Sequence, residues 1–312
     1  MTSSRTAAAS VPPDQVERSV LQRAQLRTGF EEEYPFESHW YRAGEHTLHY
    51  IDEGSGPPLL MVHGNPTWSF AWRRFVKELS REYRVIAIDH LGCGFSEKPQ
   101  DRGLYVLDQH IARLAGLVES LDLQDVTLFG HDWGGAIGMG CAGRQPSRFK
   151  RFVLMNTAAF RSRRIPVRIA LCRIPVLGRI AVQGLNLFSL MALRMAVSQP
   201  LPRPVRDGLV APYDSWQNRI AVHEFVQDIP LQQSHRSYQT LVDVEQCLAQ
   251  FQNHPVLLVW GMQDWCFTPE FLDEFRKRFP AAEELPLEQA GHYVFEDGFQ
   301  DIMPRVRKFL SQ

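Results

Sequence analysis

Runs of buried β-forming residues that alternate with amphipathic segments constrain the fold of this chain more than any other feature of its sequence. Four such runs are expected as strands, at Pro58–Val62, Tyr83–Ile88, Val126–Phe129 and Phe152–Leu154. Helices are expected around them, over Phe70–Leu79, over Asp108–Leu121, and from Gly134 to about Gln145. Apolar strands joined by helical crossovers are typical of a parallel sheet covered by helices on both faces. Two short runs that flank Gly44 predict a preceding hairpin.

A helical segment interrupts this alternation. From residue 158 to residue 230 the pattern is helical, rich in Arg and punctuated by prolines, and the strand pattern returns only at Pro255–Trp260. A helix over Glu270–Phe279, a strand over Glu284–Leu287 and a helix over Gln300–Leu310 follow. We therefore predict an α/β core domain of residues 36–157 and 231–312, an inserted helical cap of residues 158–230, and a flexible or loosely packed N-terminal extension of residues 1–35.

Charge is divided unequally between these parts. The chain holds 34 basic and 35 acidic residues, so it has no overall electrostatic attraction to nucleic acid. The cap has ten Arg, no Lys and four acids, a net charge of +6, whereas 24 basic and 31 acidic residues elsewhere give −7. The Arg-rich stretch Arg161–Arg179 could contact an anionic membrane or an acidic partner, or support self-association. The simpler interpretation is a cap helix whose Arg side chains are solvated or paired with the acidic core.

The chain shows no membrane-spanning pattern and no disulfide framework. The longest charge-free apolar run, Ile180–Leu193, is shorter than the roughly 20 residues that a spanning helix needs. The first twenty residues lack the continuous apolar run of a secretory signal. The five cysteines are odd in number and scattered, without a C-x-x-C pair. These features favour a reducing compartment, and we expect a cytoplasmic protein.

The sharpest local motif is FGHDWGG, from Phe129 to Gly135, where a strand runs directly into a helix. It has the form of a nucleophile elbow with Asp132 in the place of the nucleophile. Its glycines permit a tight turn that raises the central side chain above the sheet. The alternative is that Asp132 is an N-cap of the following helix.

Two further residues occur in the chain order that this elbow requires, first an acid and then a histidine. Asp264 follows the strand PVLLVW, and His292 follows the last strand, so both are expected at strand carboxyl ends. Taken singly, Asp264 could be a turn or cap residue and His292 a structural histidine. The order of all three predicts a catalytic triad.

Asn65 and Trp133 are candidate donors to an anion. Asn65 lies in HGNP directly after the first parallel strand, where the elbow fold supplies its second oxyanion donor, and Trp133 follows Asp132. An amide N–H and an indole N–H could converge on a leaving anion. The alternatives are a turn dipeptide at Asn65 and a buried aromatic residue at Trp133.

Several motifs together resemble a known family. HGNPTWSFAWR, DHLGCGFSEKP, GHDWGG, WGMQDWCF and AGHYVFED, which begin at His63, Asp89, Gly130, Trp260 and Ala290, resemble the haloalkane dehalogenases of the α/β-hydrolase superfamily. The acid at Asp264 and the Asn that accompanies Trp133 resemble the third dehalogenase subfamily. With the cap stretches at 156–166 and 212–230, the same motifs also resemble the β-lactone decarboxylases of long-chain olefin biosynthesis. The resemblance implies a small apolar substrate.

A mechanism follows from these residues. An ionised Asp132 can displace a leaving group from saturated carbon without a base, which gives an alkyl ester. His292, oriented by Asp264, then activates water to hydrolyse the ester, while backbone N–H groups of Asn65 and Trp133 hold the oxyanion. No metal or cofactor is required.

The sequence ranks four functions. Haloalkane dehalogenase comes first and β-lactone decarboxylase is the close alternative, because a lactone carboxylate could occupy the site of a halide. Epoxide hydrolase is third, since it needs cap tyrosines, for which the candidates are Tyr213 and Tyr238. A non-catalytic receptor on the same fold is last, because Asp132, Asp264 and His292 are all present.

Overall fold

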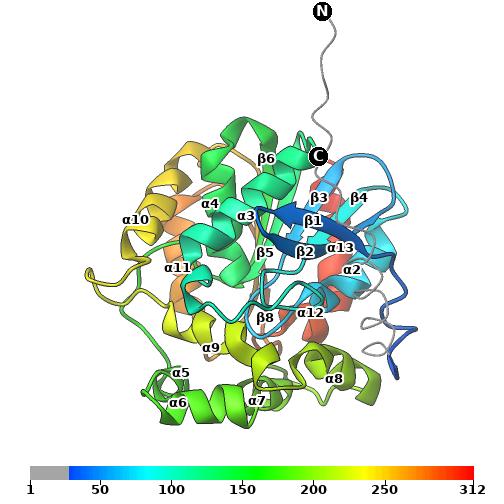
Figure 1. The fold of residues 1–312 in the computed structure, drawn as a ribbon. Helices are drawn as coiled ribbons and strands as arrows, with labels where there is room; N and C mark the ends of the chain where they lie inside the picture. Colours follow the sequence, from blue (N-terminus) through cyan, green and yellow to red (C-terminus); the bar gives the residue numbers. More distant parts are fainter. Residues whose placement is uncertain (1–27) are drawn as a thin grey trace, which may run out of the picture.

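A computed structural model describes residues 28–312 as an eight-stranded sheet flanked by helices (Figure 1). The strand order is β1-β2-β4-β3-β5-β6-β7-β8. The strands are β1 (His39–Ala43), β2 (His46–Glu53), β3 (Pro58–Val62), β4 (Arg84–Ile88), β5 (Val126–Asp132), β6 (Phe149–Thr157), β7 (Val256–Gly261) and β8 (Glu283–Leu287). The pairs β1-β2 and β2-β4 are antiparallel, and all others are parallel. The prediction of a hairpin followed by a parallel sheet is confirmed.

Helices cover both faces of the sheet, as the alternating pattern predicted. The core helices are α2 (Arg73–Leu79), α3 (Leu107–Ser120), α4 (Trp133–Arg144), α10 (Tyr238–Cys247), α11 (Pro269–Arg278), α12 (Val294–Asp297) and α13 (Phe299–Leu310). Leu60 and Val62 of β3 pack in the same apolar cluster as α3 and α4. The alternate residues Leu59 and Met61 pack with α2 and α13 on the other face. The period of two along a strand thus divides the core into two layers.

The predicted element boundaries differ from the structure in two instructive places. The helix expected over Phe70–Leu79 begins as a 3-10 turn, Ser69–Trp72, before α2. The strand expected over Phe152–Leu154 extends over Phe149–Thr157, because pairing with β5 continues beyond the apolar run. Hydrogen bonding to the neighbouring strand, rather than hydrophobicity, sets the ends of β6.

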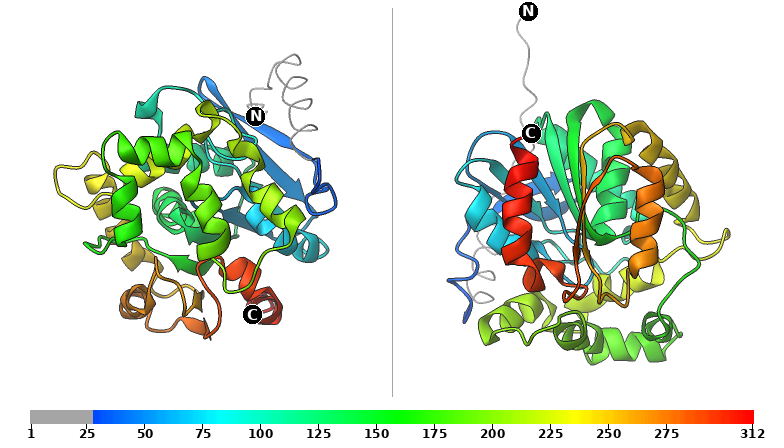
Figure 2. Two further views of the ribbon diagram at one scale, coloured as in Figure 1. Left: turned by 90° about the horizontal axis from the view of Figure 1, so that it is seen from below. Right: turned by 180° about the vertical axis from the view of Figure 1, so that it is seen from behind.

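The cap lies across one end of the molecule, beyond the carboxyl ends of the parallel strands (Figures 1 and 2). Its helices are α5 (Val167–Cys172), α6 (Leu177–Arg179), α7 (Leu187–Met195), α8 (Arg203–Val210) and α9 (Ile220–Gln227). The apolar run Ile180–Leu193 is not one helix, since a π-helical turn over Ile180–Gly184 is followed by a break at Asn186, whose φ is 53°. No helix between residues 28 and 312 is both long and apolar enough to cross a membrane.

The predicted N-terminal extension is described only in part. Residues 1–27 lie outside the described residues. Within 28–35, Phe30 and Tyr34 are buried, and their rings contact Trp68. The Tyr34 hydroxyl also lies 2.5 Å from Oγ of Ser69. This end of the extension therefore packs on the core.

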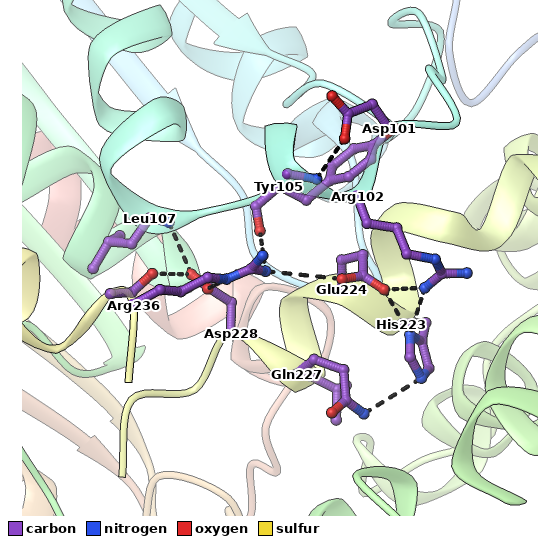
Figure 3. A network of polar contacts seen from close by, with 12 residues as sticks. Asp101, Arg102, Tyr105, Leu107, His223, Glu224, Gln227, Asp228 and Arg236 are labelled. Atoms are coloured by element: carbon purple, nitrogen blue, oxygen red, sulfur yellow. Dashed lines mark hydrogen bonds and ion pairs between the residues drawn. The ribbon is translucent and has the colours of Figure 1, made fainter. Parts of the chain in front are cut away.

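A polar network holds α9 to the core (Figure 3). Glu224 of α9 accepts a hydrogen bond from Arg102 in the loop before α3, and Nδ1 of His223 lies 2.9 Å from the same Glu224 oxygen. Asp228, at the end of α9, accepts from the backbone N–H of Leu107 at 2.8 Å. Burial alone would raise the pKa of Glu224, but the hydrogen bond from His223 and the charge of Arg102 lower it below its ordinary value.

We expect Glu224→Gln to lower the free energy of unfolding at pH 7 by about 2 kcal/mol, because Arg102 loses its buried charged partner. The native pKa of Glu224 lies below its ordinary value of 4.5, so this stabilisation is present above pH 4.5 and is lost as the pH falls through the native value. Urea denaturation of both proteins at several pH values measures the difference.

Asp207→Asn is the matched control, because the Arg203–Asp207 pair on the cap is exposed and should contribute less than about 1 kcal/mol. Equal destabilisation by the two substitutions, or a Glu224 effect independent of pH, would contradict the role of the network.

Candidate active site

Asp132 lies at the junction of β5 and α4, in a backbone conformation that few side chains adopt. Its φ is 53° and its ψ is −123°. The turn needs glycine on both sides of the cleft: a Cβ on Gly134 would lie 1.9 Å from the carbonyl oxygen of Val62, and one on Gly64 would lie 2.0 Å from Oδ1 of Asp132. The Asp132 side chain makes no N-cap hydrogen bond, so the alternative role as a helix cap is wrong. The structure has the predicted elbow.

The structure brings Asp132, His292 and Asp264 together. Nε2 of His292 lies 3.9 Å from Oδ2 of Asp132, and Nδ1 lies 2.8 Å from Oδ2 of Asp264. Asp264 follows β7 and His292 follows β8, so both come from loops at strand carboxyl ends. This is the geometry in which an acid orients a base toward a nucleophile or its ester.

The Asp132 carboxyl group is held by backbone donors. Its Oδ1 accepts a hydrogen bond from the backbone N–H of Asn65 at 2.6 Å, and the backbone N–H of Trp133 also acts to lower the pKa of this group. Burial raises the pKa of Asp132 above its ordinary value, while His292 and these two donors oppose the rise. The charge of His292 and these donors therefore offset part of the cost of burying the ionised carboxylate.

The surroundings of His292 favour its charged form, whereas burial of Asp132 favours the neutral form of that group. Burial alone would lower its pKa, but the carboxylates of Asp264 and Asp132 raise it above its ordinary value. The hydrogen bond to Asp264 fixes Nδ1, so Nε2 is the nitrogen that faces Asp132. The imidazole can therefore accept a proton from a molecule beside Asp132 and carry the resulting charge.

Asn65 and Trp133 both line the cavity above Asp132. Nδ2 of Asn65 donates one hydrogen to the carbonyl oxygen of Val222 on α9, at 3.1 Å. An amide nitrogen has two hydrogens, so one remains for a bound anion. The Trp133 ring contacts Phe225 of α9, with ring centroids 5.5 Å apart. The cap thus positions both predicted donors.

The cavity is large and mainly apolar. Its volume is about 470 Å³, and Asp132 and His292 lie in its wall. Most of the lining comes from apolar side chains of α5 and α7 in the cap and of the core beneath them, including Ile169, Phe188 and Phe271. A site of this size and polarity suits a flexible apolar molecule.

Asn156 is a site residue that the sequence analysis missed. Its Nδ2 donates to Oδ2 of Asp264 at 2.9 Å, and its Oδ1 accepts from the backbone N–H of Gly261 at 2.7 Å. Asn156 therefore orients the acid that orients His292. Its place near the end of a parallel strand, with Asp264 after the next one, was the available signal.

The tyrosines that an epoxide hydrolase would need do not reach the site. Tyr213 is buried away from the cavity, where its hydroxyl donates to the carbonyl oxygen of Thr67 at 3.1 Å. Tyr238 begins α10 and does not line the cavity either. Among residues 28–312, no group of three or more His, Cys, Asp or Glu side chains is arranged to hold a metal ion.

Comparison with known proteins agrees with this geometry. Residues 57–171 and 185–299 match the alpha/beta hydrolase fold family. A cis-3-alkyl-4-alkyloxetan-2-one decarboxylase of Shewanella oneidensis is 41% identical over 89% of this chain and 89% of its own length. Haloalkane dehalogenase 2 of Mycobacterium bovis is 32% identical over 85% of this chain and 91% of its own. The crystal structure of a haloalkane dehalogenase from Agrobacterium tumefaciens has a TM-score of 0.79 at 25% identity, over 88% of this chain and 96% of that one.

The chain belongs to the alpha/beta hydrolase fold family. Its relatives are enzymes, which agrees with the prediction of an enzyme rather than a non-catalytic receptor. Both activities that the sequence favoured occur among these relatives, one in each group.

We expect Asp264→Asn to lower the pKa of His292, because burial is then opposed only by the charge of Asp132 and no longer by that of Asp264. NMR titration of the imidazole signals measures this pKa. Any hydrolysis that uses His292 as a base should slow by about 100-fold or more. Glu288→Gln, an exposed acid in the loop before His292, is the control and should change neither quantity. An unchanged His292 pKa in Asp264→Asn would show that another acid fills this role.

Proposed function

We propose that the protein is a decarboxylase of cis-3,4-dialkyl β-lactones, which it converts to an alkene and carbon dioxide. The observation that carries the proposal is the Asp132 carboxylate in the wall of a cavity of about 470 Å³, whose largely apolar lining suits a small polar ring with alkyl substituents. The 41% identity to a β-lactone decarboxylase, against 32% to a dehalogenase, supports this order of the two activities.

The first step is a displacement at saturated carbon. An oxygen of Asp132 attacks C4 of the lactone, a C4–O bond to the enzyme forms, and the ring C4–O bond breaks with its electron pair on the lactone oxygen. The products are an alkyl ester of Asp132 and a free carboxylate on C3. The second hydrogen of the Asn65 amide can donate to this carboxylate.

The second step needs neither water nor a proton. The C3–carboxylate bond breaks, its electron pair forms the C3=C4 double bond, and the Asp132 carboxylate leaves from C4 as carbon dioxide is lost. The backbone N–H groups of Asn65 and Trp133 receive the carboxylate again. Attack inverts C4, and anti departure of the two groups then gives a cis alkene from a cis lactone.

Haloalkane dehalogenation is the second candidate, and one observation favours it. Asn65 and Trp133 supply uncharged donors beside Asp132, which suits a halide, since a halide needs hydrogen bonds and no proton on leaving. The alkyl ester then has no carboxylate to lose and must be hydrolysed by water that His292 activates. The same site thus supports both reactions. Both form an alkyl ester of Asp132, and they differ in whether that ester loses carbon dioxide or is hydrolysed.

The proposed setting is the cytoplasm. The five cysteines are all free, and burial raises the pKa of Cys93 to about 12, which keeps that thiol protonated. Free thiols of this kind fit a reducing compartment.

A comparison of two substrates with chains of equal length tests the proposal. We expect the purified protein to convert a long-chain cis β-lactone to cis alkene and carbon dioxide with a kcat/KM about 100-fold or more above that for a terminal bromoalkane, a difference near 3 kcal/mol. Gas chromatography of the alkene and detection of bromide measure the two reactions. Asp132→Asn, which keeps the shape of the side chain, should abolish both.

An equal or greater efficiency toward the bromoalkane would establish the second candidate instead. Activity that survives in Asp132→Asn would rule out both mechanisms.

We expect His292→Phe to separate the two reactions. With a bromoalkane the ester should accumulate, because only its hydrolysis needs a base, and intact mass spectrometry should show one alkyl adduct, located on the Asp132 peptide. With the lactone the same variant should continue to release alkene within about tenfold of the unmodified rate, whereas loss of a general base usually costs about 100-fold or more. An equal loss of both reactions would show that His292 takes part in decarboxylation.

A further inference from the structure

The outer surface of the cap has an unusual distribution of apolar side chains. Among residues 28–312, every large hydrophobic side chain classed as exposed lies between Val167 and Trp216. Ten of the eleven lie between Val167 and Met191, which is the segment of α5, α6 and α7. Val167 is 74% exposed and Leu177 is 66% exposed. A concentration of this kind marks an interaction surface, because single exposed apolar residues are normally scattered.

One of these residues is also held in a strained backbone conformation. Val176 has a φ of 67°, which is unfavourable for a β-branched residue, and its side chain is 68% exposed. The Val176 side chain belongs to neither apolar core cluster. A hydrogen bond from the backbone N–H of Leu177 to the carbonyl oxygen of Pro175 at 2.8 Å closes this turn, which presents the Val176 side chain to solvent.

The charge of the same segment has one sign. From residue 158 to residue 206 the chain has nine Arg, no Lys and no acidic residue. Arg161 and Arg164 pair with Glu245 and Glu270 of the core, as the simpler interpretation of the cap predicted. Arg163, Arg168 and Arg194 are exposed and make no ion pair with any residue of the described chain. Guanidinium groups without acidic partners, interspersed with exposed apolar side chains, are suited to phosphate and to an apolar layer beneath it.

The cavity above Asp132 reaches this surface. Leu171, Leu187 and Met191 are exposed and also line the cavity, and Arg164 and Arg168 line it with them. The helices α5 and α7 belong to the layer of the cap that covers this end of the molecule (Figures 1 and 2). An apolar molecule could therefore pass from an apolar layer into the site without crossing water.

We propose that this cap face, defined by the exposed apolar and Arg side chains of residues 161–194, docks on an anionic lipid surface and takes its substrate from the lipid. The path for an apolar substrate rests on the proposed function, whereas the charge and the exposure of the face do not. Docking is peripheral, since no helix among the described residues spans a membrane.

Two other occupants fit the surface less well. A second copy of the chain in a symmetric contact would place two Arg-rich faces of the same sign against each other. An acidic protein partner would satisfy the charge, but the highly exposed Val176 and Leu177 favour an apolar layer. Both occupants are outcomes that the following experiment detects.

Flotation of the full chain with lipid vesicles tests the proposal. We expect binding at low ionic strength to vesicles in which about one third of the lipid is anionic phosphatidylglycerol, weaker binding to pure phosphatidylcholine, and loss of binding as salt is added. Substitution of both Arg163→Gln and Arg194→Gln should lower the partition coefficient about 30-fold. Arg81→Gln, in the loop that leads into the amino end of β4 and so away from the cap, should leave it unchanged.

The apolar contribution is tested separately. Leu177→Gln with Leu185→Gln should lower the partition coefficient at least about tenfold, and Leu177→Met with Leu185→Met should retain binding. Neither residue lines the cavity, so turnover of a short water-soluble substrate and the unfolding temperature should not change. Because binding is measured without turnover, its failure and the failure of the proposed function are distinguishable.

Absence of binding to the anionic vesicles at low salt would overturn the proposal. The proposal would also be overturned if both double Gln variants, the one at Arg163 and Arg194 and the one at Leu177 and Leu185, bound the vesicles as well as the unmodified protein. The cap face would then not be the surface that contacts the lipid. A dimer in sedimentation analysis that dissociates in Leu177→Gln with Leu185→Gln would identify a second copy as the occupant instead.

Discussion

The buried Asp132 carboxylate is the group on which the rest of this site depends. A carboxylate removed from water is costly unless donors replace the water. The backbone N–H of Asn65 donates to the carboxylate, and the backbone N–H of Trp133 at the start of α4 favours its charged form from the other side of the cleft. They can reach it because β3 and β5 are neighbours in the sheet and because Gly64 and Gly134 leave no side chain in the way. The sheet order, the strained turn and the glycines therefore serve one electrostatic requirement.

The cap both covers the cavity and contacts the residues beside Asp132. The Asn65 amide donates to the carbonyl oxygen of Val222, and the Trp133 ring contacts Phe225, so α9 contacts the side chains of both candidate donors beside Asp132. The same helix is held to the core through Glu224 and Asp228. A displacement of α9 would therefore alter the donors directly. The helices α5 and α7, which have the exposed apolar face, instead form the wall and mouth of the cavity.

Much of the fold and of the candidate site could be predicted from local sequence patterns. The order of strands and helices follows from residue periodicity, and the elbow motif predicts the chain order of Asp132 at the end of β5, Asp264 after β7 and His292 after β8. Strand ends were less predictable, because β5 and β6 remain paired as far as Asp132 and Thr157, beyond their apolar runs. Asn156 was missed because its partners Asp264 and Gly261 are more than one hundred residues away in the chain.

The sequence by itself determined the elbow, the candidate triad, the inserted cap and the excess of Arg within it, because each depends on residue type and spacing along the chain. Only the tertiary structure decided that Asn65 is held by Val222, that Asn156 holds Asp264, and that the apolar residues of α5 to α7 face outward around the mouth of the cavity. An amphipathic pattern shows that a helix has an apolar side, but not whether that side faces the core or remains exposed. That choice depends on contacts between segments far apart in the chain, which no local pattern specifies.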